Sequence, residues 1–331
     1  MTAIPSGAPG STSRPASARR GCLVVLAALL APIPLIWLSA ATLVAHGLRF
    51  PPSIPYSTKP PAAPIKPQPP ETRGLRELLG PGAQEITLRT ESGGLRALQM
   101  PAARPRSAVV LVYPNQPDPR VVVSYYRVVH SAGYCVLIID YAGQAADSQS
   151  GRGFGWEQRR DVIDASNAMR RRGMQAIAVL GVSEGAAAAL FAGAQGAPVA
   201  AIIADSSYAD LGGLLKRIPP LDSLNPLFDR TILWELGLMM GRSIHDLAPA
   251  KAAAKLDGRS LMVINGADDP LAPPADAQKI LAAAQGPKQL WIAAGAGHAA
   301  ALATDPEQYE QRVGAFLARY LGAPPPPTQR K

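Results

Sequence analysis

The chain has 331 residues, of which 47% are hydrophobic and 17% charged, so it can form one large domain with additional segments. Its formal net charge is +9, yet no nucleic-acid-binding motif accompanies the charge, so we do not expect nucleic acid as a partner. Much of the excess charge lies in the flanking segments, where attraction to anionic lipid head groups is an alternative role. The two cysteines, Cys22 and Cys135, lie far apart in the chain and exclude a disulfide framework.

The N-terminal region contains a long segment without charged residues. Residues 1–20 are rich in Ser, Pro, Gly and Arg, which predicts a disordered basic tail. Residues 21–48 contain no Asp, Glu, Lys or Arg and exceed the length that a bilayer core requires, which predicts an uncleaved transmembrane signal-anchor. A cleaved signal peptide ending near residues 39–41, or a buried helix of a soluble protein, are the alternatives. Lipidation of Cys22 is a further alternative.

The flanks of this segment indicate an orientation and a spacer. Three arginines precede the segment and favour a cytoplasmic N-terminus, although cations such as Arg49 follow it. We therefore expect a single-pass membrane protein whose main domain lies outside the cytoplasm. Residues 49–80 include a dense set of prolines between 51 and 70, which predicts an extended Pro-rich linker. A ligand for a proline-binding partner is the alternative.

Strand-like and helix-like segments alternate from residue 83 onwards. Residues 85–89 and 94–100 predict a polar-faced hairpin, and apolar runs predict strands at 108–113, 134–140, 177–180, 200–204, 261–265 and 289–293. Helices are expected at 119–132, 156–172, 184–195, 274–285 and 305–321. This alternation predicts an α/β fold over residues 81–322, with a mainly parallel twisted sheet flanked by helices. Residues 323–331 are expected to form a disordered C-terminal tail.

The pentapeptide Gly-Val-Ser-Glu-Gly at residues 181–185 is the most informative motif. It lies between an apolar run and an alanine-rich run, so the pattern predicts a strand, a sharp turn and a helix, with Ser183 at the tip. Such a turn projects a nucleophilic hydroxyl above the edge of the sheet and requires very small residues on both sides. Because short Gly-rich motifs also arise by chance, the strand and helix around the motif support the prediction more than the motif does.

An activated serine needs a base, and the base needs a group that orients it. Both are expected just after later strands, because ligands of parallel sheets bind beyond the carboxyl ends of the strands. Asp268 and Asp269 follow the strand at 261–265, and His298 follows the strand at 289–293. The candidate catalytic residues are therefore Ser183, Asp269 and His298, with Asp268 as the competing acid.

These motifs resemble the α/β-hydrolase superfamily over residues 85–321. The resemblance places the acid three residues after Gly266, which selects Asp269. It also implies an oxyanion hole formed by the backbone N–H groups of Glu184 and Gln116, with Asn115 as the alternative to Gln116. No metal or organic cofactor is implied. The loop before Gln116 departs from the family pattern, because it lacks the His-Gly with which that loop often starts.

The resemblance further implies a serine hydrolase that cleaves carboxylic esters or thioesters through an acyl-enzyme on Ser183. The expected partner is a small-molecule acyl ester or thioester. The single N-terminal span is similar to a membrane-anchored branch of serine esterases and thioesterases. The apolar segment 206–250 occupies the position of the family's lid, where it either faces an acyl chain or membrane or simply packs over the sheet. A peptidase or amidase, and a non-catalytic membrane-tethered binding protein, are the alternative functions.

Overall fold

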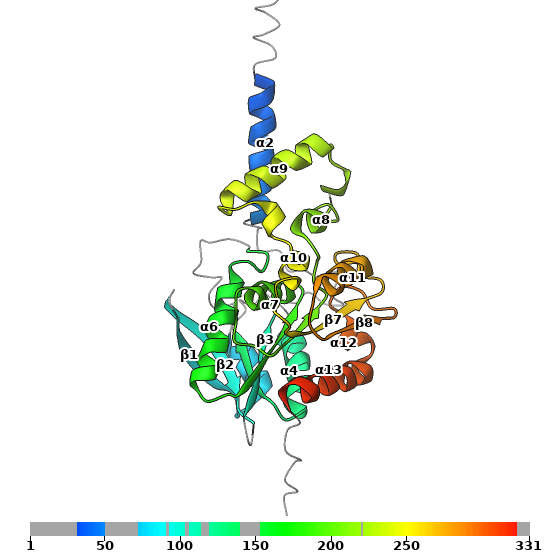
Figure 1. Ribbon diagram of the computed structural model, residues 1–331. Helices are drawn as coiled ribbons and strands as arrows, with labels where there is room; N and C mark the ends of the chain where they lie inside the picture. The colour runs from blue at the N-terminus through cyan, green and yellow to red at the C-terminus, as the bar shows by residue number, and fades with distance from the viewer. Residues whose placement is uncertain are drawn as a thin grey trace, which may run out of the picture.

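The computed structural model describes residues 32–49, 72–90, 93–102, 106–113, 119–139, 153–219 and 221–322. The predicted tails at 1–20 and 323–331, Cys22 and the proline-rich stretch 51–70 lie outside the described residues. Figure 1 shows one body built around a sheet, with a single helix rising from one end of it.

An eight-stranded sheet forms the centre of the body. Its strands are β1 (Gln84–Thr90), β2 (Gly93–Met100), β3 (Ser107–Val112), β4 (Cys135–Ile139), β5 (Ala176–Val182), β6 (Ala201–Asp205), β7 (Ser260–Gly266) and β8 (Lys288–Ala293). The spatial order is β1-β2-β4-β3-β5-β6-β7-β8, and every pairing is parallel except the two that β2 makes. The predicted strands and the mainly parallel α/β architecture are thus confirmed, including the N-terminal hairpin.

Helices cover both faces of the sheet. One face carries α6 (Gln158–Arg171), α7 (Glu184–Ala194), α10 (Pro249–Ala253) and α11 (Pro274–Ala283). The other carries α3 (Thr72–Leu79), α4 (Pro119–Ser131), α12 (Ala301–Thr304) and α13 (Pro306–Leu321). Each layer buries its own apolar cluster against the sheet, so the central strands are apolar on both sides, as parallel strands require.

The winding direction of the chain reverses beside β3. After β3 the chain passes through α4 to β4 on one side, and then crosses through α6 to β5 on the other side. Such a reversal opens a crevice at the carboxyl ends of the two neighbouring strands, where ligands of open α/β sheets bind. Ser183 is the first residue after β5, so the fold places it at this point.

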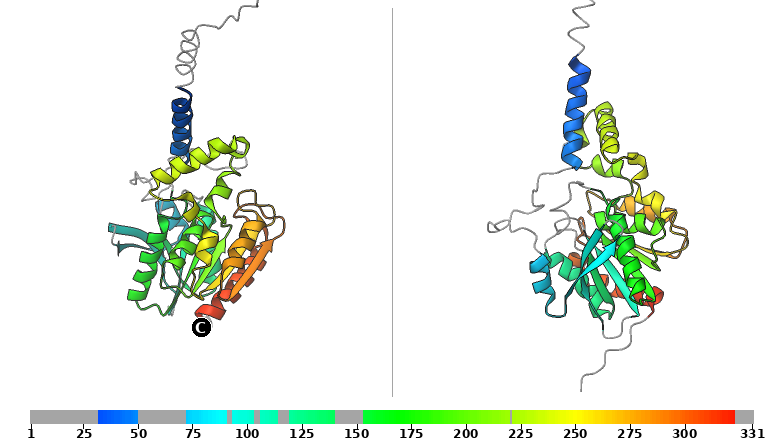
Figure 2. Two further views of the ribbon diagram at one scale, coloured as in Figure 1. Left: turned by 45° about the horizontal axis from the view of Figure 1, so that its top comes forward. Right: turned by 90° about the vertical axis from the view of Figure 1, so that its left-hand side faces the viewer.

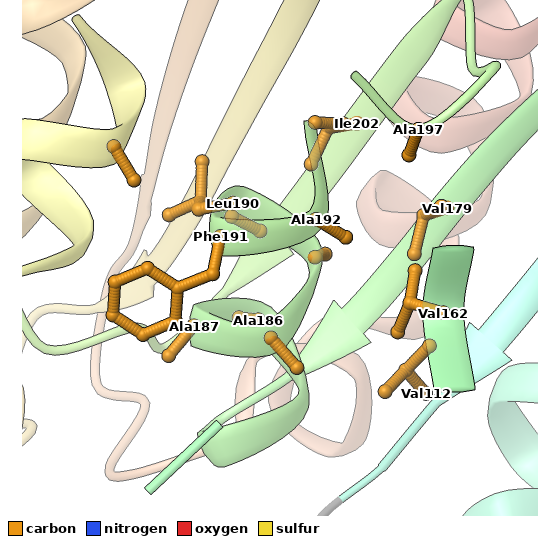
Figure 3. Packing of buried hydrophobic residues seen from close by; sticks show 14 of the residues in the cluster. Val112, Val162, Val179, Ala186, Ala187, Leu190, Phe191, Ala192, Ala197 and Ile202 are labelled. Carbon is orange, nitrogen blue, oxygen red and sulfur yellow. The ribbon is translucent and has the colours of Figure 1, made fainter. Parts of the chain in front are cut away.

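Helix α7 packs very closely against the sheet. All its residues from Glu184 to Gly193 are buried, and Figure 3 shows its alanines beside valines of the strands and of α6. A Cβ added at Gly193 would lie only 2.5 Å from the Ile202 side chain. The alanine-rich sequence therefore reflects a helix that is surrounded by protein and needs small side chains to approach the strands.

The segment between β6 and β7 contains the predicted lid segment 206–250, which we call the lid region, and it contacts the N-terminal helix. The region contains α8 (Leu211–Leu215), η1 (Leu221–Ser223), α9 (Pro226–Met239) and η2 (Ile244–Asp246), followed by α10. Helix α2 (Pro32–Arg49) lies beside α9, and the two views of Figure 2 agree on this arrangement. Trp37 of α2 stacks edge-on against Phe228 with ring centroids 4.9 Å apart, and its Nε1 donates to Thr231 Oγ1 at 3.2 Å.

The predicted membrane segment 21–48 falls only partly within the described residues, which include α2 but not residues 21–31. Within the described ranges, no helix combines the length and the apolar character needed to cross a bilayer. Part of α2 is instead packed on the body, since Ala41 and Ala45 are fully buried and Arg49 pairs with Glu157 at 3.2 Å.

The predicted linker 49–80 also differs from its expected extended form at its C-terminal end. Residues 72–79 form α3, and Leu75 is buried in the cluster that α3 shares with α4. The segment packed against the core therefore extends back to residue 72, whereas the pattern of strands predicted that the domain starts at residue 81. The reason is that a single well-placed leucine can attach a short segment to the core without any long apolar run in the sequence.

Candidate active site

Ser183 occupies a strained turn between β5 and α7. Its backbone has φ 55° and ψ −116°, which is a conformation that non-glycine residues rarely adopt. The Ser183 N–H donates to the carbonyl of Asp205 at 2.8 Å, and the Ser183 carbonyl accepts from the Ala186 N–H at 3.0 Å. Hydrogen bonds on both sides of the residue therefore hold the strained conformation and direct the side chain beyond the end of the sheet.

The two glycines of the motif are required because backbones meet there. A Cβ at Gly181 would lie 2.3 Å from the Gly185 carbonyl oxygen, and a Cβ at Gly185 would lie 2.3 Å from the Val112 carbonyl oxygen. These atoms are backbone and cannot rotate away. The spacing of two residues on each side of Ser183 thus has a steric cause that the sequence motif correctly indicated.

The structure brings Ser183, His298 and Asp269 into one hydrogen-bonded chain. Ser183 Oγ lies 2.8 Å from His298 Nε2, and His298 Nδ1 lies 2.8 Å from Asp269 Oδ2. The His298 side chain is 25% exposed, whereas the Asp269 side chain is fully buried. A proton on Nδ1 donated to the carboxylate leaves Nε2 free to accept the serine proton, which is the arrangement that general-base catalysis requires.

Asp269 rather than Asp268 faces the histidine. Asp269 Oδ1 accepts hydrogen bonds from the backbone N–H groups of Leu271 and Ala272, at 2.9 and 2.8 Å. These bonds fix the carboxylate and leave Oδ2 for His298. Asp268 is exposed to solvent. The tight turn after β7 therefore buries Asp269 in hydrogen bonds and leaves the adjacent Asp268 in solvent.

A buried carboxylate that sequence analysis did not identify lies beneath the histidine loop. Asp205, the last residue of β6, has no exposed surface and accepts hydrogen bonds from Tyr309 Oη and Ser206 Oγ, both at 2.9 Å. Tyr125 Oη lies 3.2 Å from Asp205 Oδ2, the same oxygen that accepts from Tyr309. Burial raises the pKa of Asp205 to about 6, while these hydrogen bonds and the charge of His298 oppose the rise.

This network also holds the residue that follows the histidine. The Ala299 N–H donates to Ser206 Oγ at 3.1 Å, and the Ala299 carbonyl lies 3.3 Å from Tyr125 Oη. Ala299 has a φ of 53°, which is unfavourable for a residue with a side chain. Asp205 and its partners therefore support the loop that carries His298. The available sequence signal was an acid at the carboxyl end of a predicted strand, followed by two serines.

The candidate oxyanion residues are described only in part. Glu184 is the first residue of α7, and its side chain accepts from the Gly155 N–H at 3.2 Å and from Gln158 Nε2 at 2.9 Å. The carboxylate beside the nucleophile is thus engaged with the segment before α6. Gln116 and its alternative Asn115 lie outside the described residues. Across the ranges that the structure describes, no three His, Cys, Asp or Glu side chains gather closely enough to hold a metal ion.

Comparisons with known proteins bear on the fold. No family model matches the chain, and no curated protein matches it. Solved structures do match. An esterase from Pyrococcus furiosus superposes with a TM-score of 0.57 at 18% identity, covering 80% of this chain and 100% of the esterase. The esterase domain of a Rhodothermus marinus protein gives a TM-score of 0.54 at 17% identity, covering 72% of this chain and 100% of that domain.

A peptidase shares the same architecture. A puromycin-hydrolysing peptidase from Mycobacterium tuberculosis gives a TM-score of 0.56 at 19% identity, covering 72% of this chain and 39% of the peptidase. The chain therefore has a fold that is consistent with that of α/β-hydrolases, as its motifs indicated. At these identities the likeness concerns the fold, and the activity has to be argued from the site.

Proposed function

We propose that this chain is a serine hydrolase that cleaves carboxylic esters or thioesters. The observation that carries the proposal is the continuous hydrogen-bonded chain from Ser183 Oγ through His298 to the buried Asp269. The serine of this chain lies on a strained turn at the topological switch point of the sheet, where substrates of such folds bind. Because two esterases share this fold, ester hydrolysis is the first reaction to test.

The reaction follows from the roles that this geometry permits. Ser183 Oγ attacks the acyl carbon while His298 Nε2 takes the serine proton, and Asp269 holds the resulting imidazolium. The backbone N–H groups of Glu184 and Gln116 would donate to the oxyanion. His298 then returns the proton to the departing alcohol or thiol, which leaves an ester between the acyl group and Ser183. Water activated by His298 hydrolyses this ester and regenerates the serine.

The test is labelling with a fluorophosphonate probe, which reacts with activated serines. Wild-type protein should be labelled and should hydrolyse p-nitrophenyl esters, while Ser183→Ala should lose both properties. Ser124→Ala removes an exposed hydroxyl on α4 and serves as the matched control that keeps both. Folded wild-type protein that takes up no probe would contradict the proposal and would favour the non-catalytic binding protein.

A peptidase or amidase is the second candidate, because the puromycin-hydrolysing peptidase shares the fold. Both functions use the same nucleophile and base, so probe labelling does not separate them. The rates of hydrolysis of an ester and of the amide of the same acyl group, measured in parallel, separate the two functions. We expect the ester and thioester to be cleaved much faster, and a comparable amide rate would favour the peptidase.

We also propose that residues 21–48 attach the chain to a membrane, with the hydrolase body outside the cytoplasm. The support is the absence of charged residues from this segment and the arginines that precede it. Alkaline carbonate extraction of membranes is the test. The full chain should stay in the membrane pellet, and release into the supernatant would contradict the attachment.

A further inference from the structure

The lid helix α9 presents a stripe of large side chains to solvent. Leu227, Arg230, Trp234 and Leu238 are all exposed and follow each other at spacings of three, four and four residues, so they share one side of the helix. Leu227 is 63% exposed, and Trp234 and Leu238 are each 58% exposed. The opposite side of α9 is buried through Ile232 and Leu236. The exposed stripe is therefore a second apolar face that the body of the protein leaves uncovered.

The N-terminal half of α2 adds to this surface. Leu35 is 68% exposed and Ile36 is 65% exposed, while Trp37 between this half and α9 is stacked on Phe228. Both helices lie at the same end of the molecule, away from α3 and α13 (Figure 1 and Figure 2). We call the exposed residues Leu35, Ile36, Leu227, Trp234 and Leu238 the apolar platform.

We propose that the apolar platform rests in the surface layer of a lipid bilayer. This proposal extends the proposed membrane attachment of residues 21–48 to helix α9, and it does not depend on hydrolytic activity. Its chemistry is that of an interfacial helix, in which leucines enter the acyl region, a tryptophan lies at head-group depth and an arginine reaches anionic head groups.

The exposure pattern favours lipid over a protein partner. From residue 34 to residue 40 every side chain of α2 is exposed except Trp37, so exposure runs almost all the way around the helix. A second copy or another folded protein would cover one side of such a helix, whereas lipid surrounds it. The sequence that precedes α2, residues 21–31, contains no charged residue and therefore suits the same environment.

The experiment uses the full chain with Cys22→Ser, so that the buried Cys135 is the only native cysteine. Leu227→Cys and Leu238→Cys each place an environment-sensitive NBD fluorophore on the platform. Leu78→Cys is the matched control, because Leu78 is a 48% exposed leucine on α3, which packs on the other face of the sheet. The proteins are mixed with phosphatidylcholine–phosphatidylglycerol vesicles whose acyl chains are either ordinary or brominated.

Positions 227 and 238 should show blue-shifted emission in vesicles and several-fold stronger quenching by brominated chains than position 78. Quenching at both positions no stronger than at position 78 would overturn the proposal. A blue shift that occurs without lipid and grows with protein concentration would also overturn it, since a second copy would then cover the platform. Unchanged urea-unfolding midpoints of the labelled variants ensure that each result reports on folded protein.

Discussion

Two adjacent aspartates show that the position of a side chain decides whether it can contact the histidine of the site. Asp268 and Asp269 carry the same charge and differ by one place in the chain, yet only Asp269 is buried and hydrogen-bonded to His298. Two backbone N–H groups hold its other oxygen, so the carboxylate is fixed before any substrate arrives. A carboxylate in this position selects the histidine tautomer that can accept the serine proton.

Asp269→Asn should therefore lower kcat for p-nitrophenyl ester hydrolysis by roughly 10³- to 10⁴-fold, because an amide no longer favours the correct tautomer. Asp268→Asn is the matched control and should change kcat by less than about twofold, since its side chain is exposed. Steady-state kinetics of the two variants provides the measurement. Equal losses in both variants would mean that the loop charge, and not the contact with His298, supports the activity.

At the scale of secondary-structure elements, one arginine connects the lid region to the loop that carries the acid. Arg217, just after α8, donates through Nη1 to the Leu271 carbonyl at 2.7 Å and to Asp276 Oδ2 at 2.8 Å, and through Nη2 to Asp276 Oδ1 at 3.0 Å. The Asp276 side chain is only 1% exposed and also accepts from the Ala209 N–H. Arg217 thus joins the lid region to the loop that carries Asp269 and, through the buried carboxylate of Asp276, to α11.

Arg217→Met should destabilise the protein by about 2–4 kcal/mol, because it removes the closer and less exposed of the two cations beside the buried Asp276. We also expect lower kcat, since the Leu271 carbonyl loses its donor close to Asp269. Lys279→Met is the control, because Lys279 is 60% exposed and lies 3.9 Å from the same carboxylate. Its effect on urea unfolding should stay below about 1 kcal/mol. A similar loss from both substitutions would contradict a specific role of Arg217.

At the scale of the whole molecule, the buried Asp205 makes folding depend on pH. Burial raises its pKa to about 6, so between about pH 4 and that value the folded protein keeps a proton that the unfolded chain has released. This contribution to stability is fully present below about pH 4 and is lost as the pH rises through the folded pKa. Ionising the carboxylate costs more in the folded core than in the unfolded chain.

Asp205→Asn removes this titration. The free energy of unfolding of the wild type relative to that of the variant should fall by about 2 kcal/mol between about pH 4 and pH 6.5. Urea unfolding across this pH range measures the difference. Asp222→Asn, at an exposed carboxylate on η1, shows whether the loss of any aspartate has the same result. A constant difference between wild type and Asp205→Asn would contradict the proposed proton uptake.

The eight strands and the order of the candidate catalytic residues were accessible from the sequence, because both depend on local patterns. Strands buried on both faces appear as unbroken apolar runs, and the turn around Ser183 demands glycines at fixed spacing. An acid or a histidine that directly follows a strand of a parallel sheet is then expected at the same edge of the sheet as Ser183.

Only the tertiary structure decided what joins residues far apart in the chain. It placed Asp205 against Tyr125 and Tyr309, attached α3 to the core, and set α2 beside α9. No local pattern predicts these contacts, because each depends on where the sheet order brings separate segments together. The sequence by itself determined the elements and the chemical groups at their ends, whereas packing determined which of those groups meet.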